Sequence, residues 1–330
     1  MKSRAIVIGQ PGGPEVLRLA ELDVPLPGPG QVVVRHTAIG VNFIDVQHRT
    51  GRYPLPAYPA PLGLEAVGVV EQVGEGVSLA AGDRVAYSYP PPGAYADRRC
   101  MAAGHLVPVP HALDDDRVAT VFNKGLTAHY LVHTTHRVMP GETILVHAAA
   151  GGVGSLLCQW ASAKGATVIG TVGSAAKAPI AAANGCAHVI DYGTEDFTAR
   201  VREITGGQGV HVVYDSVGRD TIQGSLACLS RRGLLVSFGT ASGPVPPFDL
   251  FALNRMGSLY VTSPAYVTHV EDRAELLSRA DDVFAALTAG TLRMTSPRIY
   301  PLADAAQAHR DLEGRAVTGV AILRPAGAAS

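Results

Sequence analysis

Residues 142–177 constrain the fold of this chain more than any other stretch. A short apolar run with strand character covers residues 144–147, and the small residues Ala150, Gly151, Gly152, Val153 and Gly154 follow it. An apolar helical pattern then covers 155–163, and residues 167–172 form a second apolar run. Strand, glycine turn, helix and strand in this order predict one βαβ unit of the dinucleotide-binding type.

The small residues of this turn suit a pyrophosphate. Ala149, Gly151 and Gly154 occupy the three fingerprint positions, with alanine in place of the first glycine. Small side chains let the backbone approach the ligand closely, and the N–H groups at the start of a helix favour anionic oxygens. The alternative is a tight turn that binds no ligand, but its position between a strand and a helix of a βαβ unit favours nucleotide binding.

The end of the second strand indicates which dinucleotide is bound. NAD-specific folds usually place Asp or Glu there, whereas this chain has Gly173 and Ser174, with Lys177 three residues further on. No carboxylate would repel a 2′-phosphate, Ser174 can donate a hydrogen bond to it, and Lys177 can supply a positive charge. The pattern favours NADP(H). The alternative is that Ser174 only caps a helix and Lys177 is a solvated lysine.

Composition bounds the class of protein. The chain has 330 residues, which suits two domains, and 47 % of them are hydrophobic. A formal net charge of −1 provides no basic surface field, so we expect neither nucleic acid nor membrane as a partner. No apolar stretch is long enough to span a bilayer, and the N-terminus carries no signal-peptide pattern. We therefore expect a cytoplasmic protein.

The four cysteines are dispersed and show no C-x-x-C spacing. This favours reduced, buried thiols in a cytosolic protein over a disulfide framework or a zinc site. They are Cys100, Cys158, Cys186 and Cys228.

The remaining pattern predicts an α/β protein with two kinds of domain. Residues 1–125 are rich in Gly, Pro and short β-like runs, which predict a compact, partly open β-barrel.

Helical segments are expected from near residue 114 to 122 and over 126–136. Strands and helices then alternate through 126–265, as in a doubly wound parallel sheet. The expected strands are 143–147, 167–171, 188–191, 210–215 and 234–238, and the expected helices are 154–163, 176–184, 197–205 and 221–229. Residues 266–330 are expected to return to the first domain through a helix at 274–289 and strands at 297–300 and 317–323.

With these pieces in place, the chain resembles the medium-chain dehydrogenase/reductase superfamily, and within it the zinc-free quinone oxidoreductases that include zeta-crystallin. The motifs that carry the resemblance include GGPEVL from residue 12, GVNFIDV from 40, RTGRYPLP from 49, GLEAVGVVEQVG from 63, HAAAGGVG from 147 and RRGLLVSFGTASG from 231. The resemblance implies a GroES-like barrel, a Rossmann domain and a cofactor cleft between them. It also implies reduction of quinones by NADPH, usually in a homodimer.

The resemblance also implies a role for individual residues. Asn42 and Gln47 are implied to lie at the nicotinamide end of the cofactor, and Lys124 and Thr127 to contact it near the domain junction. The other positions are implied to bind the phosphates of the cofactor or to line the edge of its pocket. They are Ala150, Gly151, Gly152, Val153 and Gly154 for the pyrophosphate, Gly173, Ser174, Lys177 and Tyr192 for the adenosine phosphate, and Ser216, Val217, Phe238, Gly239 and Ser242 for the edge. A buried strand residue is an equal alternative for Phe238, and a simple turn tyrosine is the alternative for Tyr192.

Two positions depart from the family pattern. Relatives often carry tyrosine where this chain has Gln47, so the smaller amide is expected to widen or repolarise the substrate pocket. Asn123 stands where an apolar residue is common.

Metal chemistry is tested separately, because zinc alcohol dehydrogenases share this fold. They carry Cys at the position of Asn42 and G-H-E at the position of Gly63-Leu64-Glu65, and leucine cannot bind zinc. We therefore expect no metal. His129, His133 and His136 share one helical face, but no carboxylate or cysteine adjoins them in the sequence, so we interpret them as an ordinary helix face.

A quinone is already electrophilic, so its reduction by hydride, or by stepwise electron transfer, mainly needs positioning. Tyr53 is the best candidate proton donor, with Asn42 as the orienting group, and Asp45 is interpreted as a structural carboxylate. We expect no essential acid or base. The closest rival is an NADPH-dependent enone or enoyl reductase, which must protonate carbon. A non-catalytic crystallin-like or RNA-binding protein is the rival of another class.

Overall fold

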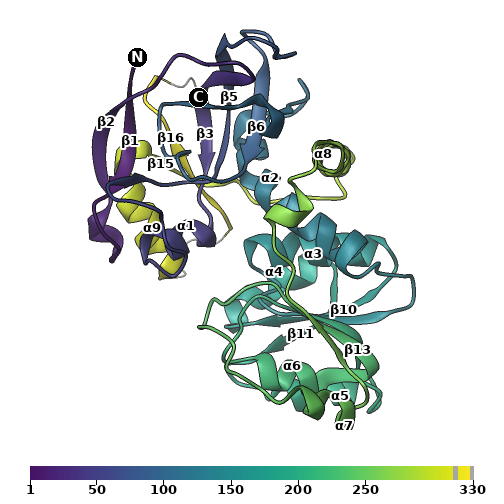
Figure 1. Ribbon diagram of the computed structural model, residues 1–330. Helices are drawn as coiled ribbons and strands as arrows, with labels where there is room; N and C mark the ends of the chain where they lie inside the picture. Colours follow the sequence, from purple (N-terminus) through teal and green to yellow (C-terminus); the bar gives the residue numbers. More distant parts are fainter. Residues whose placement is uncertain (315–318, 328–330) are drawn as a thin grey trace. The chain divides into compact units, whose positions relative to one another are not determined.

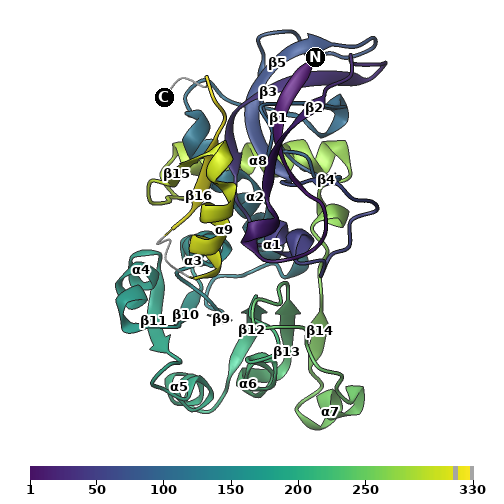
Figure 2. The same cartoon turned by 90° about the vertical axis from the view of Figure 1, so that its left-hand side faces the viewer.

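The computed structural model describes residues 1–314 and 319–327. The chain divides into two compact units, which Figures 1 and 2 draw from two directions. The first comprises Met1–Asn123, Glu271–Thr288 and Met294–Ser330, and the second comprises Lys124–Val270 and Ala289–Arg293.

The first unit is built on two sheets that are almost wholly antiparallel. A three-stranded sheet contains β2 (Arg18–Asp23), β1 (Lys2–Ile8) and β4 (Ala60–Pro61) in that order. A seven-stranded sheet contains β3 (Gln31–Gly40), β5 (Glu65–Val73), β6 (Arg84–Ser88), β7 (Arg98–Ala102), β8 (Val107–Pro108), β15 (Arg298–Pro301) and β16 (Ala321–Arg324). The long strand β3 pairs with β5, β7 and β16, so it joins the two ends of the chain in one sheet. Short strands in two linked sheets are the architecture expected of the barrel.

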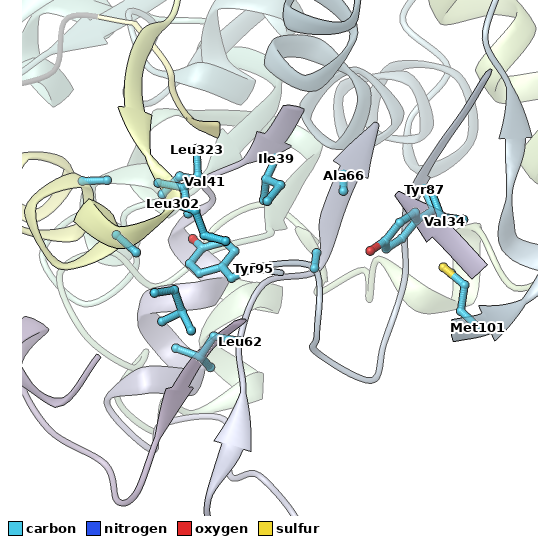
Figure 3. Packing of buried hydrophobic residues seen from close by; sticks show 14 of the residues in the cluster. Val34, Ile39, Val41, Leu62, Ala66, Tyr87, Tyr95, Met101, Leu302 and Leu323 are labelled. Atoms are coloured by element: carbon cyan, nitrogen blue, oxygen red, sulfur yellow. The ribbon is translucent and has the colours of Figure 1, made fainter. Parts of the chain in front are cut away.

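The core of this unit lies between the sheets and the C-terminal segment. Val34 and Ile39 of β3 are fully buried, and Leu302 and Leu323 pack in the same cluster. Figure 3 shows Leu302 and Leu323 near Val41 and Tyr95. Burying one such aliphatic side chain stabilises a fold by roughly 1.5–3 kcal/mol. The C-terminal strand and helix are therefore part of the core that positions the site.

Helices flank these sheets. They are α1 (Phe43–Arg49), α2 (Asp115–Tyr130), α8 (Arg273–Thr288) and α9 (Ala305–Glu313), with 3-10 turns at Pro14–Val16, Ala103–His105 and Leu302–Asp304. α9 lies beside α1 although more than 250 residues separate them, and Arg49 of α1 bonds Glu313 of α9 at 2.7 and 2.8 Å.

The second unit contains a six-stranded sheet that is parallel throughout its described pairs. The strands are β9 (Thr143–Val146), β10 (Thr167–Val172), β11 (Cys186–Asp191), β12 (Val210–Asp215), β13 (Leu229–Ser237) and β14 (Tyr260–Thr262). Their spatial order is β11-β10-β9-β12-β13-β14. This is the 3-2-1-4-5-6 order of a Rossmann sheet, with the chain reversing direction between β9 and β12.

Helices cover both faces of this sheet. They are α3 (Gly152–Ala163), α4 (Ala178–Ala183), α5 (Phe197–Ile204), α6 (Ile222–Cys228) and α7 (Leu250–Arg255). Figure 1 shows α3 and α4 on one face and α5 and α6 on the other. The expected doubly wound sheet is confirmed. No helix among the described residues has the length and apolarity needed to cross a bilayer.

Several sequence expectations need correction. The two helices expected at 114–122 and 126–136 are one helix, α2, followed by a π-helical turn over Leu131–Thr135. Gly125 does not break α2, because the helix is held by tertiary packing, for example Phe122 against Phe284 at 5.8 Å between ring centroids. The helix expected at 176–184 is a 3-10 turn, Ala175–Lys177, followed by the short α4.

Other elements were not expected from the sequence. They are β2, α1, α7 and α9. The strand expected at 317–323 is observed as β16, which begins at Ala321, and Val317 lies outside the described residues.

Candidate active site

The predicted cofactor residues of the second unit gather along one edge of its parallel sheet. All six strands run in the same direction, so the segments that follow them emerge at a common carboxyl edge. The segments after β9, β10, β11, β12 and β13 contain every predicted phosphate and pocket-edge residue. β9 and β12 are neighbours that the chain leaves in opposite directions, and this is where ligands of such sheets bind.

The glycine turn after β9 is closely packed. Gly151 is the N-cap of α3, and Gly152, Val153 and Gly154 form its first turn. A Cβ at Gly154 would collide with the carbonyl oxygen of Ala148, so only glycine lets α3 start this close to β9. The first N–H groups of a helix have no carbonyl of their own helix to bond. This turn therefore offers donors to an anion.

Lys124 lies over the same turn. A Cβ at Gly152 would stand 3.0 Å from Cδ of Lys124, so the glycine leaves room for the lysine side chain. Thr127 follows three residues later on α2, which places it on the same helical face. Both side chains are more than nine-tenths buried. The structure thus brings Lys124 and the glycine turn together, and Thr127 lies about one turn further along α2.

Ser174 and Lys177 form one turn after β10. Ser174 is the N-cap of the 3-10 helix, and its carbonyl accepts the N–H of Lys177 at 3.0 Å. Tyr192 follows β11, and its N–H bonds the carbonyl of Val172, the last residue of β10, at 3.1 Å. Gly173, Ser174, Lys177 and Tyr192 are therefore neighbours. Ser174 occupies the N-cap position, but its side chain makes no capping hydrogen bond, and Tyr192 lies in the turn after β11.

The segments after β12 and β13 are joined by hydrogen bonds. Ser242 Oγ donates to the carbonyl of Val217 at 2.8 Å, and the N–H of Ala241 donates to the carbonyl of Ser216 at 3.2 Å. Phe238 is half-buried at the end of β13. A Cβ at Gly239 would lie 2.7 Å from the Ser216 carbonyl oxygen, so the two loops touch there. The five predicted edge residues thus form one continuous surface.

A buried polar group beneath this edge was not expected from the sequence. The carboxylate of Asp215 accepts hydrogen bonds from the N–H groups of Val217 and Gly218 and from the hydroxyls of Thr221 and Ser225. Ser225 Oγ also lies 2.9 Å from Nε2 of His147, whose pKa burial lowers. Asp215 thus fixes the loop that carries Val217. Its signal was a carboxylate that directly follows the apolar run VVY.

In the first unit, Asn42 is held between two buried carboxylates. Its side-chain amide donates to Glu65 Oε2 at 2.7 Å, and its backbone N–H donates to Asp45 Oδ2 at 2.8 Å. Glu65 also accepts the N–H of Asn123 at 2.7 Å, and Nδ2 of Asn123 donates to Ser88 Oγ at 2.7 Å. A carboxylate can only accept, so Nδ2 of Asn42 must face Glu65, and the orientation of the amide is fixed.

Glu65 was not predicted as a site residue. A Cβ at Gly40 would collide with its carboxylate, so the glycine of β3 clears the space for it. The signal in the sequence was a charged residue at the head of the apolar run AVGVV. Asp45 is fully buried and caps α1, in agreement with its structural interpretation.

Gln47 and Tyr53 lie close together at the end of α1. The carbonyl of Gln47 accepts the N–H of Tyr53 at 3.1 Å, and the Tyr53 ring meets His48 edge-on at 6.0 Å between centroids. Gln47 is 7 % exposed, whereas Tyr53 is 48 % exposed. Within the described residues, Oε1 of Gln47 is buried without a hydrogen-bond partner. The pair combines an unsatisfied acceptor with a solvent-accessible phenol.

The three histidines expected on one helical face are divided, because His136 follows the π-helical turn with an extended backbone. His129 and His133 stack on each other at 4.3 Å and meet Trp160 edge-on, and His136 bonds Glu142 at 3.0 Å. The described part of the chain contains no group of three His, Cys, Asp or Glu side chains arranged to hold a metal ion.

Comparison with known proteins places this geometry in a family. Residues 28–142 match the family described as alcohol dehydrogenase GroES-like domain, and residues 152–281 match the one described as zinc-binding dehydrogenase. Quinone oxidoreductase 1 of Escherichia coli is 46 % identical over 317 residues, which cover 95 % of this chain and 97 % of that protein. A 2-haloacrylate reductase of Burkholderia is also 46 % identical, over 97 % of this chain and 98 % of that protein.

A solved structure agrees with this fold over nearly the whole length. The E. coli quinone oxidoreductase complexed with NADPH superimposes with a TM-score of 0.95 at 46 % identity, covering 98 % of this chain and all of that one. The GroES-like and Rossmann architecture predicted from the sequence is therefore confirmed. The chain belongs to the quinone oxidoreductases of the medium-chain dehydrogenase/reductase superfamily.

Proposed function

We propose that this chain is an NADPH-dependent quinone reductase. The observation that carries the proposal is the carboxyl edge of the six-stranded sheet. This edge carries the glycine turn with Lys124 and the turn from Ser174 to Lys177. The chain that carries it is 46 % identical to an E. coli quinone oxidoreductase. The E. coli relative was solved with NADPH, which suits an edge that offers a lysine and no carboxylate at the end of β10.

The residues present fit this cofactor. Gly151, Gly152 and Gly154 let α3 start close to β9 and Lys124, and the free N–H groups of this first turn would take the pyrophosphate. Ser174 and Lys177 would bind the 2′-phosphate through a charge-assisted hydrogen bond. Tyr192 would flank the adenosine, and the joined loops carrying Val217 and Ser242 would border the pocket.

When bound, NADPH supplies a hydride from its nicotinamide ring. The chain's own contribution is positioning, through the Asn42 amide that Glu65 orients. Tyr53 would donate a hydrogen bond to the reduced quinone oxygen, and water could restore its proton because the side chain is half-exposed. Asn42 and Leu64 replace zinc ligands of the alcohol dehydrogenases, so we propose that the transfer uses no metal ion.

A second candidate is reduction of an activated carbon–carbon double bond. The 2-haloacrylate reductase is as similar to this chain as the quinone oxidoreductases are. This candidate keeps the same fold and coenzyme but requires a proton for carbon.

Turnover of NADPH with 1,4-benzoquinone and with a 2-haloacrylate, measured side by side, separates the two candidates. If the chain is a quinone reductase, we expect kcat/KM to be at least tenfold higher for 1,4-benzoquinone than for the 2-haloacrylate. One NADPH should be oxidised for each quinol formed. Faster reduction of the haloacrylate would instead support the second candidate. Superoxide-dependent reduction of cytochrome c, added as a probe, would reveal one-electron transfer in place of hydride transfer.

We also propose that the protein is a cytoplasmic homodimer. Leu250, Phe251 and Tyr260 are 73 %, 64 % and 60 % exposed, and β14, which carries Tyr260, is an edge strand of the described sheet. An exposed edge strand with apolar neighbours favours pairing with another chain. The four cysteines are unbonded thiols, as in proteins of a reducing compartment.

A further inference from the structure

The first unit contains two buried tyrosine–histidine pairs whose hydrogen bonds run in opposite directions. Tyr87 lies 2.9 Å from Nε2 of His36, and Tyr95 lies 3.1 Å from Nε2 of His309. All four side chains are at most 1 % exposed. The partners on the other ring nitrogen decide which way each bond runs.

In the first pair, the histidine accepts from the tyrosine. Nδ1 of His36 lies 2.7 Å from the carbonyl oxygen of Ala96, which can only accept, so Nδ1 carries the proton. Nε2 is then an acceptor for the hydroxyl of Tyr87. This chain of bonds runs from Tyr87 through His36 and ends on the Ala96 carbonyl.

In the second pair, the histidine donates to the tyrosine. Nδ1 of His309 faces the guanidinium of Arg49 at 3.2 Å, and a guanidinium can only donate. His309 therefore carries its proton on Nε2 and donates it to the oxygen of Tyr95. The hydroxyl of Tyr95 is left to donate to Asp45 Oδ2, which lies 3.0 Å away.

This second chain of bonds ends at Asn42. The same oxygen, Asp45 Oδ2, accepts the backbone N–H of Asn42 at 2.8 Å. At the other end, Arg49 makes a bidentate contact with Glu313, the last residue of α9. Figure 1 shows α9 beside α1, and Figure 3 shows the Tyr95 ring packed near Leu62 and Leu302.

Two glycines leave space for the side chains of this hydrogen-bonded network. Gly63 adopts a φ of +88°, and a Cβ there would collide with the ring of Tyr95. A left-handed glycine thus clears the ring position, as Gly40 clears the carboxylate of Glu65. Two glycines therefore leave the space for the Tyr95 ring and for the Glu65 carboxylate.

We propose that Tyr95 and His309 are positioning residues for Asn42. They act through Asp45, the carboxylate that accepts hydrogen bonds from both the Tyr95 hydroxyl and the Asn42 N–H. Neither residue needs to touch a ligand. Their task is to satisfy Asp45 so that its carboxylate stays on the N–H of Asn42. The consequence for turnover rests on the proposed function, in which the Asn42 amide serves the nicotinamide end of the cofactor.

The test compares Tyr95→Phe with Tyr87→Phe. Each substitution removes one buried hydroxyl that contacts a buried histidine and keeps its ring. We expect Tyr95→Phe to lower kcat for NADPH-dependent quinone reduction by roughly tenfold, the loss of one hydrogen bond. The dissociation constant for NADPH should change less than twofold, because the phosphate residues lie in the second unit. Tyr87→Phe should leave kcat within twofold of the wild type.

A readout that needs no turnover is amide hydrogen exchange in the peptide that contains Asn42 and Asp45. Exchange there should be faster in Tyr95→Phe and unchanged in Tyr87→Phe. His309→Leu should behave like Tyr95→Phe, whereas His309→Gln, which can still donate to Tyr95, should recover most of the wild-type rate and protection.

The outcomes are distinguishable. Equal effects of Tyr95→Phe and Tyr87→Phe on kcat and on exchange would overturn the positioning role. A wild-type protein that reduces no quinone would refute the proposed function instead. Amide hydrogen exchange would then decide by itself whether Tyr95 and His309 hold Asn42 in place.

Discussion

Ser174 and Lys177 determine the coenzyme preference in this account. Lys177 should contribute one charge-assisted hydrogen bond to the 2′-phosphate, worth about 1.5–3 kcal/mol. We expect Lys177→Ala to weaken NADPH binding by roughly tenfold or more and to leave NADH binding nearly unchanged. Calorimetric titration with both coenzymes measures this. Lys164→Ala, at the opposite end of α3, is the matched control and should affect neither. Equal weakening of both coenzymes would remove the role assigned to Lys177.

Tyr53 is the residue on which the proton supply is tested. Its ring is half-exposed, so water can replace its hydroxyl as a donor to the quinol oxygen. We expect Tyr53→Phe to lower kcat for benzoquinone by less than about tenfold, the contribution of one neutral hydrogen bond. Steady-state kinetics at saturating NADPH measures it. Complete loss of quinone reduction with coenzyme binding intact would show that Tyr53 is an essential acid.

At the scale of elements, the glycine turn should be the least tolerant part of the second unit. The Cβ of Gly154→Ala would collide with a backbone carbonyl, which cannot rotate away as a side chain can. We expect the substitution to displace the start of α3, to abolish measurable NADPH binding and to cost about 1–3 kcal/mol of unfolding free energy, as overpacking does. Thermal unfolding and coenzyme titration measure the two effects.

Gly104→Ala is the control for Gly154→Ala. Gly104 has no heavy atom within 4 Å of an added Cβ, so its substitution should change neither quantity. Tight NADPH binding by Gly154→Ala would show that α3 can start elsewhere and that the turn is not the pyrophosphate site.

Elements with strong local patterns were predictable from the sequence, and those held by distant partners were not. The unit from β9 to β10 was read correctly because apolar runs flank a glycine turn. α1 was missed because it is short and its ends are fixed by Tyr95, His309 and Glu313 rather than by its own periodicity. α2 was divided at Gly125 because propensity alone disfavours glycine within a helix.

The same distinction applies to the site. The residues on the glycine turn and after β10 follow from local motif chemistry. Glu65, Asp215 and His147 escaped prediction because a buried charged or polar side chain is meaningful only once its hydrogen-bond partners are known. The domain limits near residues 125 and 265, and the roles assigned to the site residues, stay predictions.

At the scale of the whole molecule, buried neutral histidines should make stability fall in mild acid. Burial lowers the pKa of His36 to about 4 and that of His309 to about 3, from an ordinary value of 6.5. The unfolded chain therefore takes up protons below pH 6.5 that the folded chain does not. Between pH 6.5 and about 4, each histidine should cost about 1.4 kcal/mol of unfolding free energy per pH unit.

Chemical unfolding at pH 7 and pH 5 measures this dependence. His309→Gln should reduce the difference between the two pH values by about 2 kcal/mol, because glutamine does not titrate. If the wild type has the same unfolding free energy at both pH values, His36 and His309 are not buried as neutral side chains.

The proposed dimer is also a property of the whole molecule. If β14 pairs across a two-fold axis, Tyr260→Lys should place charges at the interface and convert the protein to a monomer. Light scattering after size-exclusion chromatography should give twice the subunit mass for the wild type and the subunit mass for the variant. Leu26→Lys, at a position 75 % exposed in the first unit, should stay dimeric. A wild type that is monomeric at micromolar concentration would refute the interface.

The central claim is that a metal-independent quinone reductase draws its electrons from NADPH rather than NADH. The most direct measurement is kcat/KM for each coenzyme with 1,4-benzoquinone, on protein dialysed against a chelator. We predict full turnover after dialysis and a value at least tenfold higher for NADPH. Loss of turnover that zinc restores, or equal values for the two coenzymes, would contradict the account.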